Sequence, residues 1–365
     1  MSDLTANAPK KRLKVTVLMG GTSSEREVSL STGKQIQQAL DPAKYEVVAI
    51  DTQDFLAISS ALSADPPAIG ASNPADAHEK EAVSQQRLAT SLTNLERETR
   101  SGRPDVVFIA LHGKGGEDGT VQGMLELLGI PYTGSGVLAS ALAMDKVMSK
   151  RLFVGADIPV IRGIEVKKHP SGEWEEGEFN RKITPEIVDN LGLPVFVKPN
   201  EGGSSCGGRL VHFKEELFPA LMKALEFDDT VLIEKYLKGT ELTVGILDTE
   251  GGPLQILPVI EIVPKSEYYD YDSKYAEGGS EHIIPARISV SLTRQAQEIA
   301  EKCHRTLGCN GFSRTDMILV GEDLFVLEVN TIPGMTPTSL LPQAAEAAGI
   351  SFPDLLDRLI GSALR

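Results

Sequence analysis

The chain has little cysteine, few aromatic residues and no long apolar run. Its three cysteines, Cys206, Cys303 and Cys309, show no CxxC spacing, which argues against a disulfide framework and against a zinc site. No apolar run approaches the roughly 18–20 residues that span a bilayer. The apolar run at residues 15–19 ends in glycines and is too short for a secretory signal. We therefore expect a cytoplasmic chain that does not bind membranes.

Positive charge is also scarce. The sequence holds 36 Lys and Arg against 51 Asp and Glu, a net charge of −15. Such a balance argues against a general binder of nucleic acid or anionic lipid, although it still allows a local basic pocket for phosphates. The length of 365 residues allows two or three domains, and a hydrophobic content of 41% is typical of a globular protein.

The first third of the chain predicts an open α/β domain. A buried strand is predicted at residues 14–19, a tight glycine turn at 20–24, a helix at 25–40 and a second strand at 45–51. Strand, turn, helix and strand in this order form a βαβ unit. A further strand at 105–111 and a helix at 120–128 extend it.

The remainder alternates strand and helix patterns. The sequence predicts one helix over 137–155, a polar and loop-rich segment over 162–190, and strands at 193–198 and 231–235 with a helix at 214–225 between them. From residue 240, strand patterns alternate with helices at 291–307 and 352–363. We divide the chain into residues 1–136, 137–238 and 239–365.

The most informative segments are residues 311–316 and 324–330, which predict two adjacent antiparallel strands. Glu328 and Asn330 are two residues apart and therefore share a face, and Asp316 on the neighbouring strand can lie opposite them. Three oxygen donors on one sheet face suit Mg²⁺. Arg314 adds fixed positive charge for an oxyanion or a phosphoryl group. These residues predict a site that uses ATP.

A glycine-rich loop follows a strand that ends in Lys198. Residues 200–208 contain four glycines and two serines, whose N–H and hydroxyl donors can wrap phosphate oxygens. The Lys precedes the loop, so the segment is not a P-loop. The alternative is a hairpin whose lysine simply reaches solvent.

At residues 231–241 an apolar strand is followed by a run of charged residues. Either its backbone pairs with adenine and Glu241 with ribose, or the charges are solvated.

Residues 20–27 lead into the first predicted helix, whose N-terminal amides could hold an anion. The segment lacks the GxGxxG spacing of a dinucleotide site. Its alternative is a capping box formed by Ser24 and Glu27, which is compatible with substrate binding by Glu25.

A tyrosine-rich segment occupies residues 268–275, which hold four of the seven tyrosines and precede Gly278 and Gly279. It could be a mobile lid that excludes water, or an ordinary exposed loop. Two further residues are ambiguous on their own. His112 could face a pocket or be structural, and Lys146 alone would be interpreted as a surface lysine.

Together these motifs resemble the ATP-grasp superfamily, and specifically its D-alanine–D-alanine ligase family. The matching segments occur in the order of the family and lie at 20–29, 110–119, 131–136, 144–146, 197–199, 203–205, 269–275, 314–316 and 328–336. The segments around 55–100 and 165–185 have no clear counterpart, and we place no site there.

The resemblance implies an α/β three-domain ATP-grasp architecture, with an N-terminal open α/β domain and two domains that sandwich ATP. ATP would phosphorylate the carboxylate of one D-alanine, and the amine of a second would displace the phosphate, giving a dipeptide for peptidoglycan. Two Mg²⁺, or Mn²⁺, and a homodimer are also implied. The alternatives are a ligase with another amino or hydroxy acid acceptor, such as D-lactate, and a non-catalytic ATP-binding protein.

The resemblance also implies roles for residues that contact ATP and metal. Asp316, Glu328 and Asn330 would hold the two metal ions, with Glu328 bridging them. The phosphates would be contacted by Lys146, Lys198 and Lys274, with Ser204 and Ser205 in the phosphate loop. The adenine would lie at Glu234, Lys235 and Leu237, and the ribose at Glu241.

A second set would handle the substrates. Glu25 would bind the first ammonium, His112 would lie near the first carboxylate, and Ser339 and Leu340 would line the site of the second carboxylate. Arg314 and the Gly334 amide would stabilise the oxyanion. The lid would be pinned by hydrogen bonds among Glu25, Ser204 and Tyr275. A phenylalanine is expected at position 275 in relatives that make a depsipeptide, so Tyr275 favours the dipeptide.

Overall fold

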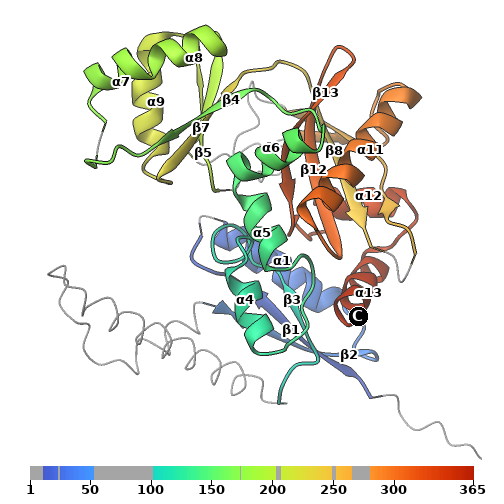
Figure 1. Cartoon of the computed structure of the whole chain (residues 1–365). Coiled ribbons are helices and arrows are strands. Elements are labelled where there is room, and N and C mark those ends of the chain that lie inside the picture. Colours follow the sequence, from blue (N-terminus) through green and yellow to red (C-terminus); the bar gives the residue numbers. More distant parts are fainter. Residues whose placement is uncertain are drawn as a thin grey trace, which may run out of the picture.

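The computed structural model describes residues 11–23, 25–52, 102–172, 174–202, 207–248, 252–264 and 280–365. Across these ranges the strands form three sheets, which Figure 1 shows as three parts of the molecule. The predicted α/β fold class is confirmed. No helix in the described ranges is long and apolar enough to cross a membrane.

The N-terminal sheet is parallel and three-stranded. Its order is β2 (Tyr45–Asp51), β1 (Leu13–Met19) and β3 (Val106–Ile109), and α1 (Arg26–Ala39) connects β1 to β2. This confirms the predicted βαβ unit. Helix α4 (Thr120–Leu127) packs with Val107 and Ile109 of β3 in a second cluster on the sheet.

The turn after β1 needs glycine. Gly20 has φ 87°, and a Cβ there would run into the Asp51 carboxylate, which forms an ion pair with Arg26. Helix α1 begins at Arg26 with Glu25 as its N-cap, and Glu25 makes no side-chain capping bond. Ser24 lies outside the described residues, so the capping box of Ser24 and Glu27 stays a prediction.

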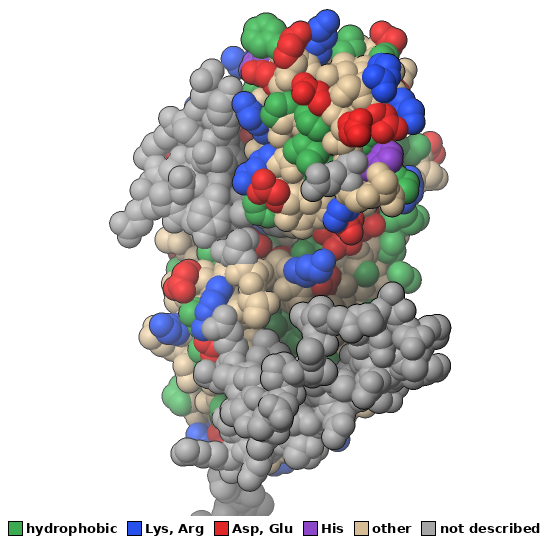
Figure 2. All heavy atoms as spheres, turned by 90° about the vertical axis from the view of Figure 1, so that its left-hand side faces the viewer, with side chains coloured by type: hydrophobic (Ala, Val, Ile, Leu, Met, Phe, Trp, Pro, Cys, Tyr) green, Lys and Arg blue, Asp and Glu red, His purple; other side chains and the backbone are tan. Residues whose placement is uncertain are grey.

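The second sheet is antiparallel and four-stranded. Its order is β4 (Gly163–Lys167), β7 (Thr230–Lys235), β5 (Val195–Pro199) and β6 (Arg209–Val211). It is accompanied by α7 (Glu176–Lys182), α8 (Thr184–Asn190), the 3₁₀ turn η1 (Lys214–Glu216) and α9 (Leu217–Ala224). Figure 2 shows acidic and basic side chains interspersed over this part of the surface.

The prediction of a loop-rich segment at 162–190 was wrong, because this segment forms β4, α7 and α8. The two helices have seven residues each and carry mostly polar side chains. Each buries one large apolar residue, Phe179 or Ile187, in the core of the four-stranded sheet. Helices this short are stabilised by packing rather than by local propensity, which is why the sequence pattern did not show them.

The third sheet is antiparallel, and its main path runs β11 (Ser280–Ile283), β10 (Ile260–Pro264), β8 (Thr240–Leu247), β12 (Phe312–Val320) and β13 (Asp323–Asn330). The short β9 (Gln255–Ile256) pairs with β8. Helices α5 (Val137–Met144), α6 (Lys146–Gly155) and α11 (Val290–Leu307) share one core with this sheet, and α12 (Leu340–Ala347) shares another.

The single helix predicted over 137–155 was wrong, because the chain breaks at Asp145. This residue is extended, with φ −79° and ψ 97°, and its carboxylate accepts a hydrogen bond from the Met148 amide at 2.8 Å. The Asn200 amide also donates to it at 2.9 Å. Asp145 is therefore the N-cap of a new helix, and the break directs Lys146 toward the second sheet.

The last helix, α13 (Phe352–Ala363), packs against the N-terminal sheet (Figure 1). Leu356 and Leu359 share a core with Val15 and Val17 of β1. The Tyr45 hydroxyl donates to Asp357 at 2.9 Å at the edge of this contact. The first and last elements of the chain therefore complete one core, while the division at residues 136 and 238 stays a prediction.

Two of the three cysteines lie in the described ranges. Cys303 and Cys309 are buried free thiols. Burial raises the pKa of Cys303 to about 12 and that of Cys309 to about 11, so both thiols are protonated at neutral pH. Cys206 lies outside the described residues.

Candidate active site

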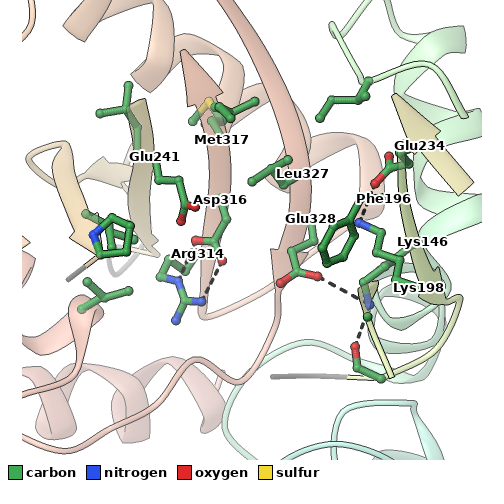
Figure 3. A pocket seen from close by; sticks show the side chains of 18 of the residues that line it. Lys146, Phe196, Lys198, Glu234, Glu241, Arg314, Asp316, Met317, Leu327 and Glu328 are labelled. Atoms are coloured by element: carbon green, nitrogen blue, oxygen red, sulfur yellow. Dashed lines mark hydrogen bonds and ion pairs between the residues drawn. The ribbon is translucent and has the colours of Figure 1, made fainter. Parts of the chain in front are cut away.

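A cavity of about 1080 Å³ lies between the second and third sheets. Many of the predicted site residues line it: Lys146, Lys198, Glu234, Lys235, Leu237, Glu241, Arg314, Asp316, Glu328, Gly334, Ser339 and Leu340. Figure 3 shows side chains from both sheets facing each other across this space. The predicted residues Ser204, Ser205, Lys274 and Tyr275 lie outside the described residues. The cavity is large enough to hold a nucleotide and a second small substrate.

One end of the cavity carries the predicted metal-binding residues. In the pairing of β12 with β13, Asp316 lies opposite Glu328 and Arg314 lies opposite Asn330. Asp316 accepts hydrogen bonds from Arg314 at 2.8 and 2.9 Å, from Asn330 at 2.9 Å and from Thr243 at 2.6 Å. The structure thus brings together the three oxygen-bearing residues and fixes the orientation of one carboxylate.

A β-bulge shapes the same end. The partner of Asp316 is Glu328, but the partner of Met317 is Val326, so Leu327 is an extra residue in β13. Leu327 and Glu328 consequently both line the cavity, although they are adjacent in sequence (Figure 3). A regular strand would direct them to opposite faces.

The other end is built around Glu234, a buried residue of β7. Its Oε2 lies 2.6 Å from Lys198 Nζ and its Oε1 lies 2.6 Å from Lys150 Nζ. Burial alone would raise the pKa of Glu234, but the two ammonium groups outweigh it and lower the pKa. Burial would likewise lower the pKa of Lys198, but Glu234 and Glu328 outweigh it and raise the pKa.

Lys150 was missed by the sequence reasoning. It lies on α6 four residues after Lys146, a spacing that places both lysines on one helix face. That spacing is the signal in the sequence from which Lys150 could have been predicted. Burial lowers the pKa of Lys150, an effect that Glu234 partly offsets.

Lys146 is buried, unlike a surface lysine. Its Nζ donates to the Gly202 carbonyl at 2.7 Å and lies 3.5 Å from Glu328 Oε2 (Figure 3). It therefore stands between the start of the glycine-rich loop and the metal-binding strand.

Apolar side chains complete the walls of the cavity. Phe196 of β5, Met317 of β12 and Leu327 of β13 line it from the two sheets (Figure 3). The sequence reasoning missed all three. Phe196 is two residues before Lys198 and hence on the same face of the strand, a signal that could have found it.

A second set of residues follows the N-terminal strands. Glu25 and His112 are buried, and a Cβ on Gly113 would lie 3.1 Å from Glu25 Oε2, which shows how closely the two segments approach. Burial lowers the pKa of His112, and the Glu25 carboxylate only partly offsets it, so the imidazole is neutral at pH 7. Within the described residues, His112 Nε2 has no hydrogen-bond partner.

Glu117 joins this set and was also missed. It accepts a hydrogen bond from the Gly113 amide at 2.8 Å. Burial, together with the nearby Glu25 carboxylate, raises the pKa of Glu117 to about 8. The HGKGGEDG segment at 112–119 contained it, but nothing in the spacing assigned it a role.

The last predicted positions form a turn before α12. The Ser339 amide donates to the Thr336 carbonyl at 2.8 Å, and the Ser339 hydroxyl accepts from the Thr336 amide at 3.1 Å. A Cβ on Gly334 would lie 2.9 Å from Ser339 Oγ, so a glycine is needed for this approach. Gly334 and Ser339 therefore lie together at the wall of the cavity.

The fold and the cavity together define an ATP-grasp enzyme. Two antiparallel sheets enclose a nucleotide-sized cavity that is lined by lysines and carboxylates. Residues 14–135 match the family model described as D-ala D-ala ligase N-terminus, and residues 152–361 match the one described as D-ala D-ala ligase C-terminus. The chain belongs to the D-alanine–D-alanine ligase family.

Individual relatives agree over nearly the whole chain. The D-alanine–D-alanine ligase of Syntrophobacter fumaroxidans is 44% identical, over 97% of this chain and 98% of the relative. That of Halalkalibacterium halodurans is 42% identical, over 97% of this chain and 100% of the relative.

Solved structures agree as well. The D-alanine–D-alanine ligase of Bacillus anthracis complexed with ATP has a TM-score of 0.71 at 33% identity, over 97% of this chain and 98% of that one. The VanG D-Ala:D-Ser ligase of Enterococcus faecalis has a TM-score of 0.72 at 31% identity, over 97% and 100%.

Proposed function

We propose that this chain joins two molecules of D-alanine into D-alanyl-D-alanine, converting ATP to ADP and phosphate, and so supplies the dipeptide of peptidoglycan. The observation that carries the proposal is the cavity in which lysines, carboxylates and Arg314 converge from two sheets in a member of this ligase family. The reaction class follows from chemistry. A carboxylate is a poor electrophile, and phosphorylation gives it a leaving group.

The residues of the site position the substrates and neutralise charge during the reaction. ATP transfers its terminal phosphoryl group to the carboxylate of the first D-alanine. The amine of the second attacks the acyl phosphate carbon, and the tetrahedral intermediate expels phosphate. Arg314 and Gly334 line the cavity, and the Arg314 guanidinium and the Gly334 amide would stabilise the oxyanion of that intermediate. Such a reaction depends on orientation and charge neutralisation more than on a strong base.

Asp316, Glu328 and Asn330 would hold two Mg²⁺, or Mn²⁺, with Glu328 bridging. The donor set fits: carboxylate and amide oxygens are the ligands that Mg²⁺ prefers, and the Asp316 and Glu328 carboxylates line the same cavity. When bound, these ions neutralise charge on the phosphates.

For ATP, we propose that Lys146, Lys198 and Lys274 contact the phosphates, with Ser204 and Ser205 in the loop beside them. Glu234, Lys235 and Leu237 would meet the adenine, and Glu241 the ribose. Phe196 and Met317 supply flat and apolar walls of the kind that hold a purine ring.

For the substrates, Glu25 would bind the ammonium of the first D-alanine. Among the described residues the buried Nε2 of the neutral His112 has no hydrogen-bond partner, which supports its place near the first carboxylate, because a buried polar atom needs a partner. Ser339 and Leu340 would line the site of the second carboxylate. Glu25, Ser204 and Tyr275 would pin the lid.

Members of this class of ligase differ in the acceptor, which is the second substrate. The fold does not decide it, because the D-Ala:D-Ser ligase VanG and the D-alanine–D-alanine ligase of Bacillus anthracis have TM-scores of 0.72 and 0.71. Tyr275 favours an amine acceptor over D-lactate.

The test is ATP- and Mg²⁺-dependent phosphate release with D-alanine, with the product identified by mass spectrometry and D-serine and D-lactate offered in competition. D-alanyl-D-alanine as the main product is expected. Turnover only with another acceptor would keep the ligase and replace the substrate. Binding of ATP without turnover would favour the non-catalytic alternative.

We also propose that the enzyme is a homodimer and works in the cytoplasm, where ATP is available. Two exposed leucines, Leu127 on α4 and Leu138 on the neighbouring α5, are consistent with a contact surface. Light scattering coupled to gel filtration would give the mass, and a monomer at micromolar concentration would contradict the dimer.

A further inference from the structure

Lys150 is a buried cation that the proposed reaction does not use. Its side chain is 8% exposed, and the described residues that line the cavity do not include it. It therefore stands behind the cavity wall, without direct access to a nucleotide. Burying an ammonium group is costly unless its charge is compensated, so its position needs an explanation.

The contacts of Lys150 point to one carboxylate. Its Nζ lies 2.6 Å from Glu234 Oε1, while the other oxygen of Glu234 lies 2.6 Å from Lys198 Nζ. Each oxygen of the carboxylate is thus held by its own ammonium group. An ammonium group 2.6 Å from each oxygen favours one orientation of the carboxylate about its last bond over the others.

Lys150 is itself held from a third side. Its Nζ lies 3.4 Å from the Val326 carbonyl of β13, and the Val326 amide donates to the Pro159 carbonyl at 2.9 Å, just after α6. The ammonium group therefore joins α6 to β7 of one sheet and to β13 of the other. Lys150 is therefore held by contacts within the protein.

We infer that Lys150 is a positioning residue for the choice of nucleotide base, because it holds the Glu234 carboxylate in the orientation that accepts a hydrogen bond from a 6-amino group. This inference rests on the proposed function, which places Glu234 at the adenine. An ionised carboxylate only accepts hydrogen bonds, so it matches the 6-amino group of adenine and repels a 6-oxo group. Such discrimination depends on the carboxylate being held in place.

The test compares ATP with inosine triphosphate, which has the same sugar and phosphates but a 6-oxo group. In Lys150→Met, we expect the KM for ATP to rise about tenfold or more, and the preference for ATP in kcat/KM to fall by about tenfold. The KM for D-alanine should stay within about twofold of the wild-type value. Lys150→Gln, which keeps an N–H donor without the charge, should lose less of the preference.

Two controls separate positioning from a general loss of stability. Lys168→Met removes an ammonium group from an exposed ion pair with Asp229 at 3.0 Å and should match the wild type. Phe153→Leu weakens the buried face of α6 without reaching Glu234, and it should lower the melting temperature while keeping the ATP preference.

The outcomes are distinguishable. A Lys150→Met enzyme that keeps the wild-type preference, even with a lowered melting temperature like that of Phe153→Leu, would overturn the inference. If Lys150→Met does not fold, an unchanged preference in Lys150→Gln would overturn it. A wild-type enzyme that uses both nucleotides alike would overturn the inference and the assignment of Glu234 to adenine. Absence of ligase activity with either nucleotide would instead overturn the proposed function.

Discussion

The two ends of the cavity hold buried charge in different ways. At the end proposed for the adenine base, here called the base end, Glu234 is 4% exposed and lies between Lys150 and Lys198, which come from other elements of the protein. At the end proposed for metal, here called the metal end, Asp316 and Glu328 are 16% and 23% exposed and open to the cavity.

The difference separates a carboxylate that is held in one orientation from carboxylates that are open to a ligand. The carboxylate at the base end is held by cations on both oxygens, and removing its charge leaves those cations uncompensated. Asp316 at the metal end is oriented by Arg314, two residues away on its own strand, by Asn330 on the next strand and by Thr243 on β8. Its charge stays available to a ligand. The base end should therefore govern stability, and the metal end should govern turnover.

The largest expected effect is on turnover at the metal end. Glu328→Gln keeps the shape of the side chain and removes a charge that faces the cavity, so kcat should fall about 1,000-fold while the fold is preserved. Phosphate release at saturating Mg²⁺ measures it. Asp323→Asn, at an exposed position on the same strand, should behave as wild type. Near-normal turnover of Glu328→Gln would remove this residue from the metal site.

The base end should respond in stability. Glu234→Gln leaves two buried ammonium groups facing a neutral amide, so the free energy of unfolding should fall by about 3 kcal/mol. Denaturant unfolding measures this. Glu178→Gln breaks an exposed pair with Lys182 at 2.6 Å and should leave stability nearly unchanged. A loss for Glu234→Gln as small as that for Glu178→Gln would contradict a stabilising role of the base end.

The cap at Asp145, where α5 ends and α6 begins, allows a test of whether the two ends of the cavity are linked. Asp145→Ala removes the cap of α6 and the acceptor of Asn200, so stability should fall by about 1–2 kcal/mol and the KM for ATP should rise because Lys146 begins this helix. Asp229→Ala, at an exposed ion pair, is the matched control. A lower melting temperature without any change in KM would show that the cap does not orient Lys146.

A further effect is a change in the pH dependence of stability at the pocket of Glu25 and His112. The pKa of Glu117 is raised to about 8, so the folded protein keeps a proton that the unfolded chain releases above about 4.5. The wild-type protein therefore loses stability as pH rises between these values. Glu117→Gln cannot titrate and should gain melting temperature relative to wild type between pH 5 and pH 8.5.

Melting curves across this pH range measure the difference. Glu298→Gln, at an exposed position on α11, should show a difference that does not vary with pH. A Glu117→Gln protein whose difference from wild type is also constant with pH would contradict the raised pKa.

Local patterns were enough to predict elements with strong periodicity and clear ends. The βαβ unit, α11 and α13 were found nearly to the residue, because glycine, serine and proline mark their ends. The convergence of Asp316, Glu328 and Asn330 was also accessible, because it follows from strand alternation across one antiparallel pair.

The remaining features depend on contacts distant in sequence. The break at Asp145 is stabilised by Asn200, and the α7 and α8 helices exist because they bury Phe179 and Ile187. The bulge at Leu327 shifts the register within an otherwise regular strand. No local pattern encodes these partners. Helical spacing could have identified Lys150, but its partner carboxylate, Glu234, lies on a strand some eighty residues later in the chain.

The helix at the end of the chain has a consequence for biosynthesis. Since α13 covers part of the core that begins with Val15 and Val17, the first strands to leave the ribosome lack this cover until residues 352–363 have been translated. Domains usually mature in the order in which they are made. Here the N-terminal sheet must wait for a helix that follows the strands of both other sheets, so the part made first closes after the parts made later. Until then the nascent chain exposes an apolar sheet face, which is a surface open to aggregation.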